Sequence, residues 1–532
     1  MTARTIAATT TRPPVTTGDE MSHRQILEAL FGILSALFVG IISSTIVSNA
    51  LPTIIADLEG TQRSYTWVVT ASLLAMTAST PLWGKLSDLL DKKLLLQLAI
   101  LTFVAGSVAA GLSRSVGELI GFRVVQGLGM GGLTALAQTV LAAMIPPRQR
   151  GRYNGYLGSV MALGTVSGPL VGGVIVDTSW LGWRWCFYVC VPLAVAALAV
   201  IQRTLHLPHV PRKVSIDWLG ATLIAGGVSV LLVWVSFAGG SFAWWSPETA
   251  AFLAGGLVLL AAAVVVERRA AEPILPPALL ADRTTVLAIL GSVAVGISMF
   301  GASVFLGQYF QVARGYSPAT AGLLTMPLMV GVLAASVVSG RLISATGRYK
   351  RFVVGGLAVL AVGLALLGTI DHRTSLWLVG AFMVLVGVGV GMSMQNLVLA
   401  VQNTVDVDQV GAASATVAFF RSMGGAVGVS VLGALLSNRV TTLVAEGLRG
   451  IGVTPPASGG STGLDVASLP GPVQEVVRAA YGDATSLIFL VGAGVTVLGL
   501  VAVALLREVP LRTTVRRAVE AEALEREPVE AA

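Results

Sequence analysis

The sequence predicts an all-α protein that crosses a membrane many times, because of its composition and its repeated apolar runs. Hydrophobic residues make up 55% of the 532 residues and charged residues only 11%, and the mean hydropathy is +0.82. A water-soluble surface on a chain of this length cannot be built from so few charges. Apolar runs of about 20 residues, the length of a helix that crosses a bilayer, recur along the whole chain. The alternating segments of roughly 10 residues that are typical of a membrane β-barrel are missing from the sequence.

We expect fourteen spans. The first 26 residues are polar, and the apolar run after them has full length and no small-residue cleavage site, so it is interpreted as an uncleaved first span. The spans cover residues 27–50, 65–83, 94–112, 118–145, 153–176, 184–202, 216–237, 249–266, 285–311, 318–344, 352–370, 376–402, 410–437 and 485–506.

The positive charges support this topology. Lys and Arg beside membrane spans are retained in the cytoplasm, and most of the 34 such residues fall on one side of the membrane when both termini are placed inside. An odd number of spans would destroy that alternation. The net charge of +7 is therefore interpreted as a topology signal and an attraction to anionic lipid, and not as a sign of nucleic-acid binding. We expect a multi-pass protein of a bacterial cytoplasmic membrane with both termini in the cytoplasm.

Internal repetition indicates two related halves. The glycine-rich "GLGMGG" at 127–132 recurs as "GVGVGM" at 387–392, and further glycines recur at the same offset. Two homologous six-span halves around a shared axis can expose a central site to either side of the membrane as one half rocks against the other. The predicted parts are a cytoplasmic tail (1–26), an N-terminal six-helix bundle (27–203), a linker with two inserted spans (204–284), a C-terminal six-helix bundle (285–506) and a cytoplasmic tail (507–532). The C-terminal bundle includes an extracytoplasmic loop (438–484). This loop is expected to be a flexible linker around a short surface helix at 472–481.

The fifth span combines closely spaced glycines with a proline. Small residues three and four apart let membrane helices approach and slide, and a proline breaks the hydrogen-bond ladder of a helix. The combination predicts a hinge, and tight packing without motion is the alternative. The residues concerned are Gly164, Gly168, Pro169, Gly172 and Gly173.

Six motifs together carry a family resemblance. They are "STIVSNALPTI" (44–54), "GKLSDLLDKK" (84–93), "RVVQGLGMGG" (123–132), "GTVSGPLVGG" (164–173), "WRWCFYVCVP" (183–192) and "FFRSMGGAVGV" (419–429). With them the chain resembles the major facilitator superfamily and, within it, the fourteen-span drug:proton antiporter branch. The resemblance implies the major facilitator fold, with two pseudo-symmetric six-helix bundles and two inserted helices. It also associates the fifth span with exporters.

The loop that opens at Gly84 is expected to act as a gate. Asp88 lies at the membrane surface among Lys85, Lys92 and Lys93, so its carboxylate can pair with them or with the positive end of a helix. Such a pair holds one side of a transporter shut and breaks when that side opens. The alternative is a solvated run of charges that only fixes the topology.

The resemblance implies a partner for this aspartate at the start of the helix near Gly411. The chain departs from the family pattern at two positions of the loop. Leu89 stands where a basic residue is usual, and Asp91 replaces a usual glycine. The gate is therefore expected to be weaker or differently connected.

Arg123 and Arg421 are the two charges placed inside the predicted spans, away from the span ends. A charge at the centre of a membrane costs roughly 2.5 to 3.5 kcal/mol, so each side chain should be buried against polar partners or water. The resemblance implies that Arg123 takes part in proton coupling. The alternatives are snorkelling to the outer interface for Arg123, and for Arg421 a structural bond to backbone carbonyls or to Gln395 and Asn396.

The acid that would take up a driving proton is missing from its usual place. The resemblance implies an aspartate in the first span at the position of Ser43, and serine does not titrate between about pH 5 and 8. Three possibilities stay open. A peripheral acid enters the proton path, Arg123 couples through the charge of the substrate, or coupling is lost. The peripheral candidates are Asp57, Asp177 and Asp406.

Neutral polar side chains in apolar spans are the candidates for a substrate cavity. A roomy, amphipathic cavity would use such groups, although hydrogen bonds between helices explain each one equally well. They are Ser43, Asn49, Gln126, Gln308, Gln311, Gln395 and Asn396.

No other chemistry is expected. The chain has no phosphate-binding G-x-x-x-x-G-K-[ST] loop, its histidines lie outside the predicted spans, and its two cysteines are interpreted as apolar fillers. We expect no enzyme activity, no cofactor and no metal. The expected partners are a small hydrophobic or amphipathic substrate, protons and membrane lipids, and the protein is expected to be a monomer.

Three functions fit these observations. The leading one is a secondary active, multidrug-type exporter that works by alternating access, with proton antiport implied by the resemblance. The second is an exporter or flippase-like carrier of an endogenous lipid or metabolite, which a neutral cavity would suit. The third is a membrane sensor that does not transport.

Overall fold

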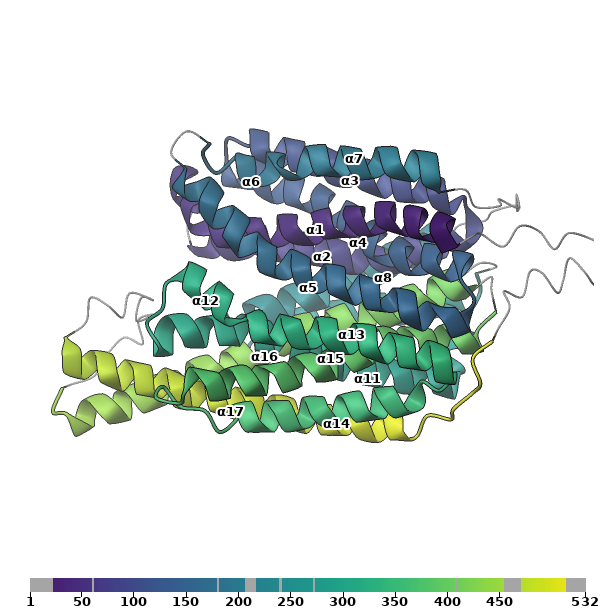
Figure 1. Ribbon diagram of the computed structural model, residues 1–532. Helices are drawn as coiled ribbons and strands as arrows, with labels where there is room; N and C mark the ends of the chain where they lie inside the picture. Colours follow the sequence, from purple (N-terminus) through teal and green to yellow (C-terminus); the bar gives the residue numbers. More distant parts are fainter. Residues whose placement is uncertain are drawn as a thin grey trace, which may run out of the picture.

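The computed structural model describes residues 23–59, 62–178, 181–205, 217–238, 242–270, 273–406, 409–453 and 470–512. Within these residues the chain forms helices and no strand, and the long helices run roughly side by side (Figure 1). The helices are α1 (His23–Asp57), α2 (Gln62–Leu89), α3 (Lys92–Leu112), α4 (Val116–Met144), α5 (Pro147–Asp177), α6 (Trp185–Tyr188), α7 (Cys190–Thr204), α8 (Trp218–Phe237), α9 (Pro247–Glu267), α10 (Pro277–Ala281), α11 (Arg283–Gln308), η1 (Tyr309–Ala313), α12 (Pro318–Leu324), α13 (Met326–Thr346), α14 (Lys350–Leu367), α15 (Leu376–Thr404), α16 (Val410–Gly450) and α17 (Gly471–Ala504).

Two large hydrophobic clusters organise the helices. One draws on α1 to α7, and the other draws almost wholly on α10 to α17. Figure 1 shows the corresponding groups of helices as two layers, one above the other. The small third cluster joins α2, α8, α9 and α16, so the two helices inserted between the halves pack where the halves meet.

The all-helical membrane fold is confirmed, but the count of fourteen spans is not. Twelve helices in the described part of the chain are long and apolar enough to cross a membrane. The helices α2 and α5 cover two further predicted spans and are not among these twelve. Both are rich in small and polar residues, and both lie between the bundles, where α2 packs on α16 and α5 packs on α13. Protein neighbours therefore replace lipid on the sides of α2 and α5 that face the other bundle.

The longest departure from the sequence prediction concerns residues 438–484. We expected a flexible linker there with a short surface helix at 472–481. Instead, α16 continues to Gly450 and α17 already begins at Gly471, and the part of the predicted linker at 454–469 lies outside the described residues. Figure 1 shows the ends of these helices projecting together beyond the rest of the molecule. Span prediction fails here because charged residues such as Arg439 and Glu446 end an apolar run without ending a helix.

The two halves approach most closely at the end of the molecule where both described chain ends lie (Figure 1). We call this the termini end. Gly84 of α2 lies against Gly411 and Ala415 of α16, and Gly151 of α5 lies against Gly340 of α13. In each pair a Cβ added to either glycine would collide with the backbone of the partner. Glycine is therefore required for the backbones to touch at both contacts.

Replacing Gly340 by valine should open the termini end. The added side chain would meet the Gly151 carbonyl oxygen, and overpacking of this kind costs about 1–3 kcal/mol. We expect less cross-linking between cysteines introduced at Gln149 and Ser344, which are neighbours in the structure. The matched control is Gly121→Val, since a Cβ at Gly121 of α4 meets nothing within 4 Å. Unchanged cross-linking in Gly340→Val would contradict this account of closure.

Candidate transport pathway and gate

Arg123 belongs to a buried polar network in the first bundle. Its Nη1 donates to Gln126 Oε1 at 2.6 Å, and its Nε donates to the Val68 carbonyl at 3.4 Å. The amide of Gln126 in turn donates to Ser43 Oγ at 3.1 Å and to Ser107 Oγ at 2.8 Å. Arg123 is 3% exposed, so it turns inward and does not snorkel. Three of the predicted residues are thus brought together from α1 and α4.

The glycines of α4 make this network possible. An added Cβ at Gly127 would meet the Ser72 carbonyl of α2, and one at Gly129 would meet the backbone of Phe103 in α3. Because α4 touches two neighbours at backbone distance, its polar side chains are enclosed rather than exposed to lipid. An enclosed polar group needs a hydrogen-bond partner, and Gln126 supplies one to each of its neighbours.

A second polar contact joins the two bundles. Gln138 Nε2 of α4 donates to Gln395 Oε1 of α15 at 2.6 Å, and Gln395 Nε2 contacts Met161 Sδ of α5 at 3.8 Å. Gln138 Oε1 and Asn154 Oδ1 are buried and have no hydrogen-bond partner among the residues that the structure describes. Sequence analysis missed Gln138 and Asn154, although Gln138 stands in an apolar span as plainly as Gln126.

The other cavity candidates are dispersed. Asn396 stays within the second bundle, where it donates to Ser339 Oγ and to the Met392 carbonyl. Gln308 is half-buried at the end of α11 and Gln311 is exposed in η1. The side chain of Asn49 lies outside the described residues. Their assignment to a substrate cavity remains a prediction.

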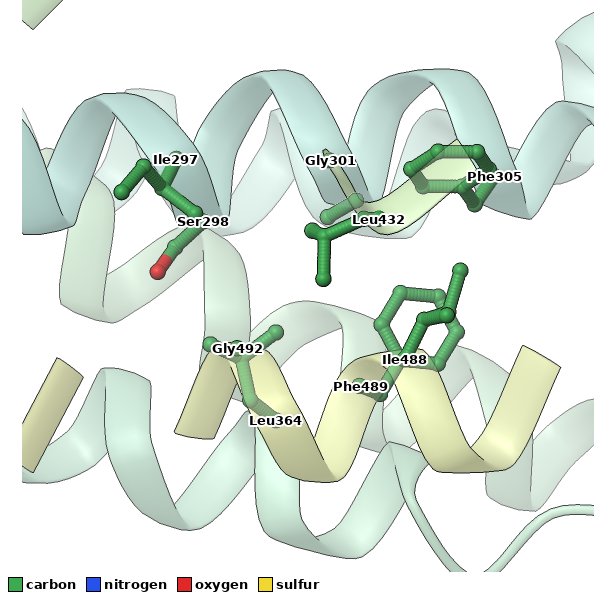
Figure 2. Close-up of a pocket in the computed structure, with 10 residues that line it drawn as sticks. Ile297, Ser298, Gly301, Phe305, Leu364, Leu432, Ile488, Phe489 and Gly492 are labelled. Atoms are coloured by element: carbon green, nitrogen blue, oxygen red, sulfur yellow. The ribbon is translucent and has the colours of Figure 1, made fainter. Parts of the chain in front are cut away.

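The pocket in Figure 2 lies within the second bundle and not between the bundles. Its walls are Ser298, Phe305, Leu432, Phe489 and other mainly apolar residues of α11, α14, α16 and α17. The space in it that admits water-sized molecules is about 10 Å³, close to the room that one water molecule needs. We therefore do not assign it to a transport substrate.

Arg421 is also buried, at 4% exposure. Its Nη1 donates to the Met394 carbonyl at 3.5 Å. In the described part of the chain this arginine thus has a backbone partner, and the amides of Gln395 and Asn396 donate elsewhere. A coupling role for Arg421 remains a prediction.

The peripheral acids lie far from the middle of the spans. Asp57 is the last residue of α1, and its Oδ2 accepts from Trp183 Nε1 at 2.7 Å and lies 3.7 Å from the Arg184 guanidinium. Asp406 is exposed just after α15 at the termini end. The side chain of Asp177, which ends α5, lies outside the described residues. Their coupling roles remain predictions.

The glycines of the fifth span form a contact surface for α1. Added Cβ atoms at Gly164, Gly168 and Gly172 would meet Ile41, Thr45 and Ile46. Gly173 and Pro169 fall within the same helix, and the Pro169 ring lies outside the described residues. The packing role of this surface is therefore visible, and the hinge remains a prediction.

The gate loop closes on the helix that the resemblance implied. Gly411 N donates to Asp88 Oδ1 at 2.8 Å, and Ala412 N donates to Asp88 Oδ2 at 2.8 Å. These amides are in the first turn of α16, where backbone N–H groups lack a partner in the helix and carry partial positive charge. We call this interaction the clasp. It joins the two bundles at the termini end.

The rest of the gate loop supports the clasp. Lys92 Nζ donates to the Ser87 carbonyl at 2.6 Å, and Lys93 Nζ donates to the Gln202 carbonyl at 2.8 Å. The two departures from the family pattern have local roles. Leu89 is buried, and Asp91 caps α3 by accepting from Leu94 N at 2.9 Å.

A second link at the termini end was not predicted. The buried Arg150 guanidinium of α5 donates to the Ile145 and Ala142 carbonyls and to Gln402 Oε1 of α15. Nearby, Arg148 N donates to the Arg512 carbonyl at 3.1 Å. The segment after α17 thus reaches the first bundle.

Asp88 lies beyond the predicted end of its span. Burial raises the pKa of its carboxyl group from 3.8 to about 7. The amides of Ala412 and Gly411 and the charges of Lys92 and Lys85 lower this pKa but do not cancel the effect of burial. In an open gate the carboxyl meets water and regains its ordinary pKa, so closure takes up a proton. This contribution to closure is complete below the ordinary pKa and is lost as the pH rises through about 7.

The termini end should therefore loosen as the pH rises from about 6 to about 8. Spin labels at the exposed residues Gln149 and Ala345 would report a longer distance at the higher pH. Asp88→Asn cannot titrate and should abolish this response. Asp91→Asn, a change of the same kind in the same loop, should keep it. An equal pH response in the two variants would show that Asp88 is not the titrating group.

The comparisons with known proteins agree with this architecture. Residues 33–429 match the family model described as Major Facilitator Superfamily. An uncharacterised MFS-type transporter of Mycobacterium tuberculosis is 38% identical over 483 residues, which are 90% of this chain and 70% of that protein. The multidrug transporter protein MdtP of Bacillus subtilis is 34% identical over 430 residues, which are 81% of this chain and 78% of that protein.

Among solved structures, the proton:xylose symporter XylE has a TM-score of 0.64 at 14% identity, over 94% of this chain and 100% of that one. At this identity the likeness concerns the fold alone. The relatives are transporters and not enzymes. The chain therefore belongs to the Major Facilitator Superfamily and is a multi-pass membrane transporter.

Proposed function

We propose that this transporter is a proton-coupled exporter of hydrophobic or amphipathic small molecules that works by alternating access. The observation that carries the proposal is the clasp, in which two backbone amides of α16 in one bundle hold the carboxylate of α2 in the other. A contact made of hydrogen bonds between two rigid bodies can open and re-form as the bodies rock.

The topology proposed from the sequence assigns the closed end of the structure to one side of the membrane. With fourteen spans and both termini in the cytoplasm, the termini end is the cytoplasmic side. The clasp, the Gly151–Gly340 contact and the Arg150–Gln402 bond then all lie on that side. The described conformation is closed toward the cytoplasm, which is the state from which an exporter releases its substrate outside.

The proposed substrate is uncharged. The polar contact deep between the bundles is the amide pair Gln138–Gln395, and the first span has Ser43 where the drug:proton branch has an acid. Amides and hydroxyls satisfy neutral polar groups on an apolar ligand. Export of toxic compounds is supported by the multidrug name of the Bacillus relative. The same neutral contacts also suit an endogenous lipid or metabolite, which is the second candidate.

Transport by the purified protein in proteoliposomes tests the proposal. We expect the neutral dye Nile red to move faster than in protein-free liposomes, the cation ethidium to move little, and dye movement to release protons that a trapped pH indicator detects. Gly340→Val, which cannot close the termini end, should lose most of the movement, and Gly121→Val should keep it. Dye movement without proton movement would contradict antiport. Movement of neither dye, together with movement of a fluorescent phospholipid, would favour the second candidate.

A further inference from the structure

The two inserted helices cover one line of contact between the bundles. In the third hydrophobic cluster, Leu74 of α2 and Phe419 of α16 pack with Ile224 of α8 and Ala263 of α9. The helix α8 thus contacts both bundles, and α9 packs on α8. Any group held by this pair of helices is therefore close to the interface that moves in alternating access.

At the termini end, the pair carries two carboxylates. Asp217 caps α8, and its Oδ1 accepts from Gly220 N at 2.8 Å. Glu267 ends α9, and its Oε2 accepts from Leu275 N at 3.0 Å. One oxygen of each carboxylate therefore accepts a hydrogen bond from a backbone amide.

The second oxygens of the two carboxylates both lie beside Gly220. Asp217 Oδ2 and Glu267 Oε1 are inaccessible to solvent and have no hydrogen-bond partner in the described part of the chain. A Cβ built on Gly220 would touch both of them, so they flank the space that one methyl group would fill. Glu267 is 5% exposed. Glycine at position 220 lets the two side chains meet beneath α8.

A single bound proton would relieve the repulsion between the two carboxylates and supply a donor to their unpaired oxygens. Two like charges at this spacing oppose the ionisation of both groups, and a buried oxygen without a donor is costly. A proton on one carboxyl lets it donate to the other, as in other carboxyl pairs that share a proton. The third charge is Lys85 of α2, which is 6% exposed and interacts electrostatically with Glu267. With one proton, the three groups are neutral together.

In the described part of the chain, the charges that act on Glu267 come from two other helices. The groups that act electrostatically on Glu267 are Asp217 from α8 and Lys85 from α2. From α16, the third cluster receives the apolar Phe419. Lys85 also acts on Asp88, so its charge connects this pair with the clasp.

We propose that Asp217 and Glu267 form a proton-binding site in which one proton is shared between Asp217 Oδ2 and Glu267 Oε1. On release, the proton passes to water at the termini end and leaves a second negative charge beside Lys85. This charge draws the ammonium group away from Asp88 and changes the clasp. The role in coupling rests on the proposed function, and the binding of the proton does not. The pair would supply the titratable carboxyl that Ser43 does not.

Infrared spectroscopy of the purified protein tests the site directly. The C=O stretch of a protonated carboxyl group is absent from a carboxylate. The measurement uses the Asp88→Asn background at neutral pH, because Asp88 is the other carboxyl expected to hold a proton there. We expect this band, and its loss in both Glu267→Gln and Asp217→Asn. Glu248→Gln, at the exposed opposite end of α9, should keep it. A band that persists in both variants overturns the proposal.

The proteoliposome assay separates failure of the site from failure of the proposed function. For the coupling role we expect Glu267→Gln to move Nile red without proton release. If wild-type protein moves no protons but the band disappears in both variants, the antiport proposal fails and the site stands. If Glu267→Gln releases protons as wild type does, the coupling role is overturned. If Glu267→Gln does not fold, the variants Asp217→Asn and Gly220→Ala replace it in both assays. In Gly220→Ala the added methyl group forces the two carboxylate oxygens apart.

Discussion

The clasp between Asp88 and the start of α16 is the interaction on which the arrangement of the two bundles depends. The first amides of a helix have no partner within it, and a carboxylate is their best acceptor. Each of these hydrogen bonds is worth about 0.5–1.5 kcal/mol when the carboxyl group is protonated and about 1.5–3 kcal/mol when it is charged, which is enough to hold two rigid bodies together and small enough to be reversed. The bonds can form only because Gly84 and Gly411 let α2 and α16 touch.

The same constraint explains where charge is found in this protein. Membrane burial makes an unpaired charge expensive, and the described charges lie mainly toward the two ends of the molecule. At the termini end they surround Asp88, Arg150 and the pair Asp217–Glu267, and at the opposite end they form pairs such as Arg373–Glu475. Deeper in the bundles the polar contacts are largely neutral, with Arg123 and Arg421 as the exceptions. The charged groups that open and close the structure therefore lie at the gate. The groups available to contact a substrate in the interior are mainly amides and hydroxyls.

The sequence was sufficient for the features that rest on local patterns. Apolar runs predicted the helices, and the loop "GKLSDLLDKK" predicted a gate whose aspartate meets the helix near Gly411. Polarity in apolar spans identified Ser43, Gln126 and Arg123, but could not show that these residues are one another's partners. Their mutual contact depends on how closely α4 packs, which no span shows by itself.

Features that join distant segments were missed. Asp217 and Glu267 each stand at the end of a predicted span, where an acid usually means only solvent exposure. Their proximity follows from the antiparallel packing of α8 and α9 and from the missing side chain at Gly220. The extension of α16 was missed for a different reason, because a helix supported by a neighbouring helix needs no continuous apolar run.

The inserted helices are attached unequally to the two bundles, and this decides how they can move. Toward α2 they present a charged cluster around Lys85, whereas toward α16 the third cluster offers apolar contact at Phe419. Electrostatic contacts in a buried site depend steeply on position, whereas apolar surfaces can slide with little loss while they stay covered. The pair α8–α9 is therefore expected to travel with the first bundle while α16 slides along it, and the state of the carboxyl pair acts on the bundle that carries Asp88.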